Sequence, residues 1–119
     1  MTSNSHTWSE GLPIYRQLVD QIIARILSGT YSEGELLPSV RQVAEDYSVN
    51  PITVTKAYNE LSQYGLTEKR RGIGTIIKAG ARSALLKIQQ EEFLKHEWPQ
   101  ILERIQRLEL DPAELLGQR

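Results

Sequence analysis

The first apolar stripe of the chain follows Pro13 and repeats every three or four residues, as one face of a helix requires. Its members are Tyr15, Leu18, Val19, Ile22, Ile23, Ile26 and Leu27. A stripe of this width is typical of a helix of about four turns that buries one side against a core. Pro13 suits the first helical position, where its missing N–H costs nothing, and Gly29 suits the end.

Two shorter stripes of the same period follow an expected loop over residues 30–37. The earlier stripe holds Val40, Val43, Ala44 and Tyr47, and the later one holds Val54, Ala57, Tyr58 and Leu61. Ser39 and Gln42 predict a capping box at the start of the earlier helix. Asn50 followed by Pro51 predicts the start of the later helix. Because only a short turn separates the two helices, the pair is predicted to form a helix-turn-helix.

A β-hairpin is predicted directly after these helices. Residues 66–70 and 75–78 have the composition of two short strands, and the loop between them, residues 71–74, reads RGIG. Glycine suits a tight hairpin loop, and the arginine places positive charge at its tip. We therefore expect a mainly α fold with a small β-hairpin, that is, a winged helix-turn-helix, followed by a short helical tail.

The last third of the chain carries further apolar residues at helical spacing. One helical segment contains Leu85, Leu86, Ile88, Phe93 and Leu94, and the next contains Trp98, Ile101, Leu102, Ile105 and Leu108. Pro99 predicts a break or kink near Trp98, and Asp111 predicts the cap of a final short helix. Residues 79–83 are small and favour a linker. The expected organisation is a flexible N-terminal arm over residues 1–11, a winged helix-turn-helix over 12–78 and a helical tail over 79–119.

Composition narrows the functional classes. The 119 residues are 39% apolar and 24% charged, which fits a soluble globular chain. Because there is no cysteine, disulfides, thiolate catalysis and cysteine-ligated zinc are excluded. No apolar run approaches the roughly 20 residues of a membrane helix, and residues 1–10 lack the apolar stretch of a signal peptide, so a cytoplasmic protein is expected.

Charge becomes informative once the chain is divided into thirds. The whole chain has 14 basic and 15 acidic residues, a net charge of −1, which excludes binding to a partner through bulk positive charge. Residues 38–79 hold six basic and four acidic residues and form the only net-basic third. Half of those basic residues are consecutive, Lys69, Arg70 and Arg71. A solvated surface would explain this run as well, so the run alone does not establish a function.

The outward face of the later helix suits DNA. When its apolar stripe is buried, the side chains left outside are Ile52, Thr53, Thr55, Lys56, Asn59 and Gln63. Hydroxyl and amide groups pair with base edges, methyl groups contact thymine and a cation pairs with phosphate, so this helix fits the major groove. An ordinary polar surface helix explains the same residues equally well, and the choice between them needs further evidence.

That evidence comes from a resemblance that covers residues 12–78 almost without gaps. The segments that carry it are 13–18 (PIYRQL), 34–41 (GELLPSVR), 49–51 (VNP), Thr53 with Val54, Ala57 and Tyr58 with Leu61, and 71–75 (RGIGT). Together they resemble the GntR family of bacterial transcription regulators. The short tail is similar to the small YtrA-like branch of that family, in which the C-terminal part is only a few helices.

The resemblance implies which side chains contact DNA. The residues that it assigns to this role are Arg41, Thr53, Arg71 and Gly72. Further residues expected in the same contact surface are Ser39, Asn50, Thr55, Lys56 and Arg70. Two positions depart from the family pattern. Ile52 stands where the branch usually has a polar residue, which predicts apolar base readout, and Ile73 stands where lysine is frequent, which weakens the contact of the tip.

The tail has more large apolar side chains than two or three helices can bury against one another. Fully burying each of them contributes roughly 1.5–3 kcal/mol, so they are expected to pack on the winged domain, on a second copy, or on both. A two-fold homodimer matches a pseudo-palindromic operator and doubles the number of phosphate contacts. The expected dimerisation residues are Leu85, Phe93, Leu94, Trp98, Ile101, Leu102, Ile105 and Leu108. An intramolecular helical cap is the alternative.

A sequence-specific regulator that binds double-stranded DNA is therefore the leading expectation, with repression as the expected mode and activation at some promoters left open. The rival is a winged-helix module that binds another protein and not DNA. No cofactor and no enzymatic activity are expected, and a small-molecule effector is not favoured, because the tail is too short to enclose a cavity. Glu92 and His96 are four residues apart on a helix and are expected to form an ion pair, not a metal site.

Overall fold

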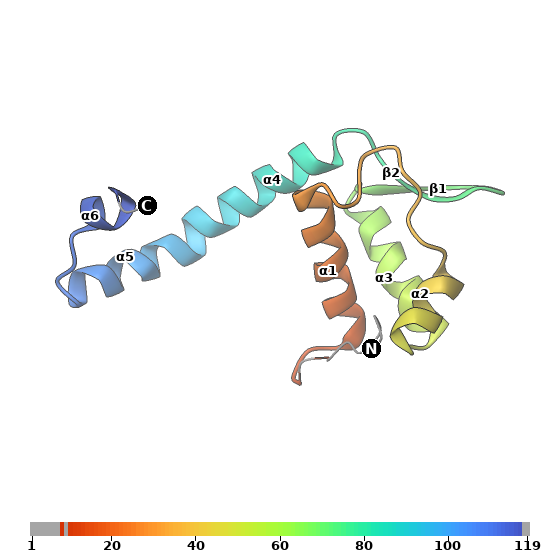
Figure 1. Ribbon diagram of the computed structural model, residues 1–119, viewed down its shortest axis with the longest axis horizontal. Coiled ribbons are helices and arrows are strands. Elements are labelled where there is room, and N and C mark those ends of the chain that lie inside the picture. The colour runs from red at the N-terminus through yellow and green to blue at the C-terminus, as the bar shows by residue number, and fades with distance from the viewer. Residues whose placement is uncertain (1–7, 9, 118–119) are drawn as a thin grey trace. The chain divides into compact units, whose positions relative to one another are not determined.

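The computed structural model describes residue 8 and residues 10–117, which divide into two compact units, Met1–Leu85 and Leu86–Arg119. The first unit contains α1 (Ile14–Ser28), α2 (Val40–Tyr47), α3 (Pro51–Gln63), β1 (Thr67–Arg70) and β2 (Gly74–Ile77) (Figure 1). The helix α4 (Ala81–Glu92) begins there, and the second unit continues with a π-helical segment (Phe93–Glu97), α5 (Trp98–Arg107) and α6 (Pro112–Gly117). The predicted fold class, mainly helical with one β-hairpin, is confirmed.

The core of the first unit is built from the predicted apolar stripes. The buried members are Leu18, Val19, Ile22 and Ile26 of α1, Val43 and Ala44 of α2, and Val54, Ala57, Tyr58 and Leu61 of α3. α3 packs against both α1 and α2, so it is held from two sides while a third side remains outside. Pro13 is the N-cap of α1, one residue before its predicted place in the helix, and Gly29 ends that helix in the left-handed conformation, as predicted.

The predicted helix starts in the helix-turn-helix are confirmed, with one correction. Ser39 Oγ accepts a hydrogen bond from the Gln42 N–H at 3.0 Å, and Asn50 Oδ1 accepts one from the Ile52 N–H at 2.8 Å. The reciprocal half of the capping box is absent, because the Gln42 side-chain amide donates to Asp46 Oδ1 at 2.8 Å instead. The carboxylate of Asp46, one turn further on, competes successfully for that amide.

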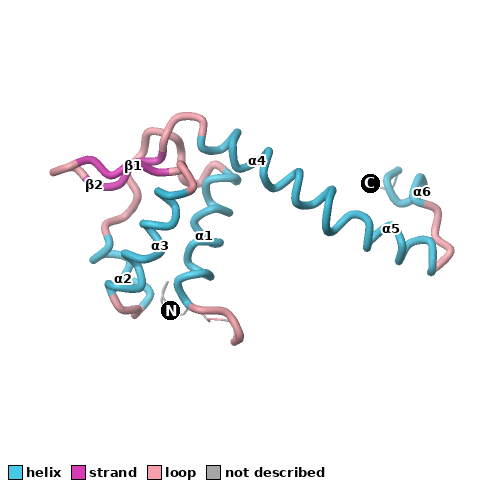
Figure 2. The backbone as a smooth tube through the Cα atoms, turned by 180° about the vertical axis from the view of Figure 1, so that it is seen from behind, coloured by secondary structure: helices cyan, strands magenta, loops and turns pink. Residues whose placement is uncertain are grey.

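The hairpin of β1 and β2 is antiparallel, with Thr67 opposite Ile77 and Arg70 opposite Gly74. In both views it extends beyond the helices as a wing (Figures 1 and 2). The loop before α2, predicted only as a loop, lies along β2 and bonds to it: the Leu37 N–H donates to the Thr75 carbonyl at 2.8 Å. The root of the wing is therefore a three-stranded arrangement whose third member is irregular.

The segment over residues 79–83, expected as a linker, is a turn followed by the first residues of α4. Ala81 and Leu85, which lie one helical turn apart at the start of α4, are 2% and 4% exposed and belong to the core of the first unit. The expected arm over residues 1–11 falls mostly outside the described residues. Of its described residues, Trp8 packs edge-on against Tyr47 of α2, with 6.2 Å between ring centroids.

The interruption predicted near Trp98 takes the form of a π-helical segment. The chain stays helical, passes through Phe93–Glu97 and enters α5 at Trp98 with proline in its first turn. The Trp98 N–H donates to the Phe93 carbonyl, so the wider π turn lies immediately before the residue that has no N–H to donate. Asp111 caps α6 as predicted, with its Oδ1 accepting from the Ala113 N–H at 3.0 Å.

Candidate nucleic-acid interface

The helix α3 has two chemically different sides. The core side is formed by Val54, Ala57, Tyr58 and Leu61, none of them more than 6% exposed. The opposite side carries the exposed side chains of Ile52, Thr55, Lys56 and Asn59. Positions i, i+3, i+4 and i+7 lie on one face of a helix, so these four residues form a continuous outward surface. Thr53, which the sequence also places on this surface, is half-buried at its edge.

The start of α3 adds a partial positive charge to that surface. The aligned peptide dipoles of a helix make its N-terminus favourable for anions such as phosphate, while the N–H groups of Ile52 and Thr53 already donate to Asn50. The oxygens of Ser39 and Asn50 already cap their helices, so the structure gives both residues a role in setting the helix starts. Both residues remain exposed and lie beside the outward surface of the helix-turn-helix.

Two cations of the helix-turn-helix have different surroundings. The Arg41 side chain is 91% exposed, and its Nε lies 3.7 Å from Glu45 Oε2. A pair this exposed contributes little to stability, so Arg41 can exchange Glu45 for a phosphate at small cost. Lys56 Nζ lies 4.0 Å from the centroid of the Tyr15 ring, a cation–π contact that turns its ammonium group toward α1.

The wing carries exposed positive charge at its tip. Lys69, Arg70 and Arg71 are all exposed, and of these Arg70 donates through Nε to Glu68 Oε2 at 3.1 Å. Within the described part of the chain, Lys69 and Arg71 form no ion pair. Gly72 has φ +78°, the left-handed conformation that glycine adopts without strain, and a Cβ there would meet nothing within 4 Å. The tip is therefore open on the side of Gly72.

A crevice of about 100 Å³ joins the outward surface of α3 to the wing. Its walls include Thr55 and Asn59 from α3, Lys69 from β1 and Thr75 from β2. The structure thus brings Thr55, a predicted contact residue of α3, next to polar side chains of both strands of the wing. Thr75 was not among the predicted contact residues; it faces Lys69 across the hairpin, a pairing that the hairpin register would have indicated.

A polar cluster holds α3 to α1 beside this surface. The Arg16 guanidinium of α1 forms an ion pair with Glu60 of α3, and the Tyr64 hydroxyl donates to Glu60 Oε2 at 2.7 Å. Hydrogen bonding to Tyr64 and the nearby Glu60 carboxylate raise the pKa of Arg16 above its usual value. The cluster fixes the end of α3 that lies away from the cap at Asn50.

A second polar cluster joins α1 to α2. Arg25 Nη1 donates to the Tyr47 hydroxyl at 2.9 Å and to the Tyr31 hydroxyl at 3.3 Å. These two hydrogen bonds raise the pKa of Arg25, and the bond to Tyr47 has the larger effect. Tyr58 of α3 donates its hydroxyl to the Pro38 carbonyl, and burial raises the pKa of that hydroxyl. Together these contacts fix α2 relative to the helix that presents the outward surface.

The residues predicted for dimerisation fall into three groups. The exposed ones are Phe93, Leu94, Ile101 and Leu108, at 40%, 61%, 41% and 59%. The half-buried ones are Trp98, Leu102 and Ile105. The prediction of Leu85 as a dimerisation residue is wrong: Leu85 is 4% exposed in the core of the first unit, so its own chain already covers its side chain. We therefore remove Leu85 from the candidate dimer surface.

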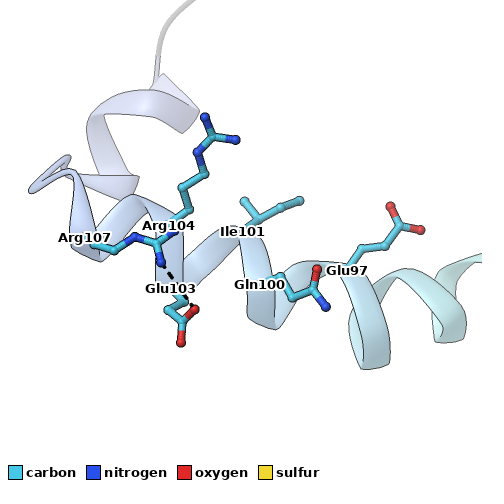
Figure 3. A pocket seen from close by; sticks show the side chains of 6 residues that line it. All are labelled: Glu97, Gln100, Ile101, Glu103, Arg104 and Arg107. Carbon is cyan, nitrogen blue, oxygen red and sulfur yellow. Dashed lines mark ion pairs between the residues drawn. The ribbon is translucent and has the colours of Figure 1, made fainter.

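The side chains of α5 also line a hollow of about 590 Å³ (Figure 3). Its lining residues are Glu97, Gln100, Ile101, Glu103, Arg104 and Arg107. Glu97, Ile101 and Arg104 point to the same side of the helix, whereas Arg107 reaches Glu103, with 3.8 Å between Nη1 and Oε1. The apolar side chain of Ile101 thus lies between an acidic and a basic side chain on this side of the helix.

The predicted pairing of the tail side chains is present as a contact of 3.8 Å between His96 Nε2 and Glu92 Oε1, which is an ion pair when the histidine is protonated. Among residue 8 and residues 10–117, no group of three or more His, Cys, Asp or Glu side chains is placed to hold a metal ion. No helix within these same residues is both long enough and apolar enough to span a bilayer.

Comparison with known proteins adds a family and several relatives. The model of bacterial regulatory proteins of the gntR family matches residues 14–77. The HTH-type transcriptional repressor YtrA of Bacillus subtilis is 43% identical over 74 residues, which cover 62% of this chain and 57% of that protein. The matched region therefore spans little more than half of that relative's length.

Two solved structures are similar to the fold. A transcriptional regulator from Oenococcus oeni has a TM-score of 0.73 at 28% identity, over 93% of this chain and 91% of that one. The AraR(DBD) in complex with operator ORX1 has a TM-score of 0.55 at 27% identity, over 61% of this chain and 89% of that one. The similarity to the first of these extends through the helical tail.

Proposed function

Because this chain belongs to the gntR family of bacterial regulatory proteins, we propose that it is a sequence-specific DNA-binding repressor that occupies a pseudo-palindromic operator as a homodimer. The observation that carries the proposal is that the outward side of α3 and the strands of the wing line one crevice, while the basic residues of the wing tip are exposed. Polar side chains on α3 suit base edges in the major groove, and free cations at the tip suit phosphate.

The named relatives support the two parts of the proposal. YtrA of Bacillus subtilis is named a repressor, and AraR(DBD) was solved with an operator. One name states repression and the other states a complex with an operator, so the proposal assigns DNA binding and no catalysis to this chain. Repression then follows from occupancy: a dimer on a promoter excludes the polymerase from the same DNA. The contact residues proposed are those predicted from the sequence, with Asn59, Lys69 and Thr75 added from the crevice.

The homodimer part of the proposal is supported by the second unit. Its exposed apolar side chains include Leu94, Ile101, Leu108 and Leu116, with Leu116 84% exposed. Apolar groups this numerous on 34 residues, 86–119, are stabilised when they meet a copy of themselves across a two-fold axis. Two winged domains joined in this way would read two half-sites in opposite directions.

A DNA-binding experiment tests the function directly. The full chain is incubated with a library of random duplexes and with the DNA upstream of its own gene, and bound DNA is sequenced and measured by gel shift at two salt concentrations. We expect one enriched motif with inverted half-sites. Arg41→Ala and Arg71→Ala should weaken its binding, whereas Lys87→Ala, an exposed cation of α4, should not. A chain that enriches no DNA, but captures a protein through the wing, would refute the proposal in favour of a protein-interaction module.

A further inference from the structure

Ile52 is the most exposed large apolar side chain in the described part of the first unit, at 76%. It is the second residue of α3 and shares the outward face with Thr55 and Asn59, which are both polar and exposed. Its backbone N–H is already used, because it donates to Asn50 Oδ1. The side chain itself contributes nothing to the core of the fold.

The fold gives no reason for isoleucine at this position. A β-branched residue has no advantage in an exposed helical turn, and a large apolar side chain in water lacks the stabilisation that burial would give it. The neighbouring outward positions of α3 hold groups that hydrogen-bond to water. A partner from outside the chain that offers an apolar group among polar ones would make isoleucine favourable here.

The major groove of DNA has one such group. Its floor presents hydrogen-bond donors and acceptors from every base pair, and its only apolar substituent is the C5 methyl of thymine. The polar neighbours Thr55 and Asn59 would suit base edges on either side of a methyl group, whereas a dry protein interface would leave them without partners. This contrast favours DNA over a second protein surface as the occupant.

We propose that Ile52 packs against a thymine methyl group and makes thymine a requirement at one position of each operator half-site. This inference rests on the proposed function, since it specifies the base that the reading surface selects. Replacing thymine with uracil removes only the methyl group and leaves every hydrogen-bonding edge unchanged. Uracil substitution therefore isolates the contact that Ile52 would make.

The test uses the full chain and the motif enriched in the selection experiment. Each thymine is replaced singly by deoxyuridine, and affinity is measured for the wild type, for Ile52→Ala and for Ile73→Ala. For the wild type we expect one position at which uracil weakens binding about fourfold, the effect of roughly one buried methylene group, and about fifteenfold when both half-sites carry it. In Ile52→Ala this penalty should disappear.

The control variant and the outcomes separate the claims. Ile73 is also an exposed isoleucine, 59% exposed at the wing tip, and Ile73→Ala should keep the uracil penalty. If no motif is enriched, the proposed function fails. If a motif is enriched but uracil is tolerated at every position, or Ile52→Ala retains the same penalty, the inference about Ile52 is overturned while the function stands. A change in the sedimentation of DNA-free Ile52→Ala would assign Ile52 to a protein contact and also overturn it.

Discussion

Glu33 Oε1 accepts a hydrogen bond at 2.9 Å from the backbone N–H of Gly80, which lies 47 residues further along the chain. The other oxygen of the same carboxylate accepts the Arg82 N–H at 3.0 Å. These N–H groups belong to the start of α4, where a helix has no internal acceptors for them. The side chain of Arg82 adds a third hydrogen bond, because its Nε donates to the Leu27 carbonyl at 2.8 Å. A loop before the helix-turn-helix thus caps the helix that leaves the first unit.

Because of this cap, the stability of the fold depends on pH in the acid range. The hydrogen bonds from Gly80 and then Arg82 lower the pKa of Glu33 below its usual value. The stabilisation is therefore complete above the ordinary glutamate pKa of about 4.3 and is lost as pH falls through the lowered pKa of the folded state. We expect Glu33→Gln to lower Tm at neutral pH, and the difference from the wild type to vanish in acid. Thermal unfolding followed by circular dichroism across that range measures it.

The comparison variant is Glu91→Gln, which removes an exposed carboxylate of α4. Its Tm should follow that of the wild type at every pH. A constant gap between Glu33→Gln and the wild type, persisting into acid, would contradict the assigned protonation.

Arg71 at the wing tip should act through phosphate. If it contacts DNA in both subunits, Arg71→Ala should weaken specific and non-specific duplexes by similar factors. It should also reduce the slope of log K against log salt by about two, one per lost phosphate contact. Fluorescence anisotropy at several salt concentrations measures both quantities. A change in base preference without a change in slope would instead place Arg71 on a base edge.

The exposed apolar residues of the second unit should control association. Leu94→Asp with Ile101→Asp places two negative charges where a partner helix is proposed, and we expect monomers at micromolar concentrations. Operator affinity should fall at least tenfold, because each half-site is then bound separately. Analytical ultracentrifugation gives the mass, and Gln106→Asp, an exposed polar position on α5, shows the effect of a single added charge outside the apolar surface. A double variant that still sediments as a dimer would exclude this surface.

Gly74 at the start of β2 is required for the wing. Its φ of +131° favours glycine, and a Cβ at this position would lie 3.2 Å from Leu36 Cδ2. We expect Gly74→Ala to destabilise the first unit by about 1–3 kcal/mol, measured by urea unfolding. Gly72→Ala, also at positive φ but in open space, should cost less. If the contact with Leu36 contributes to this destabilisation, adding Leu36→Ala to Gly74→Ala should recover part of the lost free energy of unfolding.

The features that sequence predicted well are local ones. The caps at Ser39, Asn50 and Asp111 were predicted because each depends on a side chain and an N–H two or three residues away. The apolar stripes were predicted for the same reason, since a helix brings positions three and four apart onto one face. The outward residues of α3 were predicted as those that remain when its apolar stripe is buried.

The features that sequence did not predict join distant segments. The pairing of residues 34–37 with β2, the Glu33 cap and the burial of Leu85 all depend on which segments meet in space. Leu85 has the same character as the apolar residues of the tail, and only its place one turn into α4 puts it in the core. The π-helical segment before Pro99 was missed because proline predicts an interruption but not which interruption the backbone adopts.

The division of α3 into an inner and an outer side has a consequence for how such a regulator changes its target. Ile52, Thr55 and Asn59 contribute nothing to the core, so each can be exchanged with little effect on folding. The residues proposed to contact bases are thus separate from the residues that hold the fold together. On this proposal, substituting three exposed residues of one helix changes the preferred operator while the core beneath them stays the same.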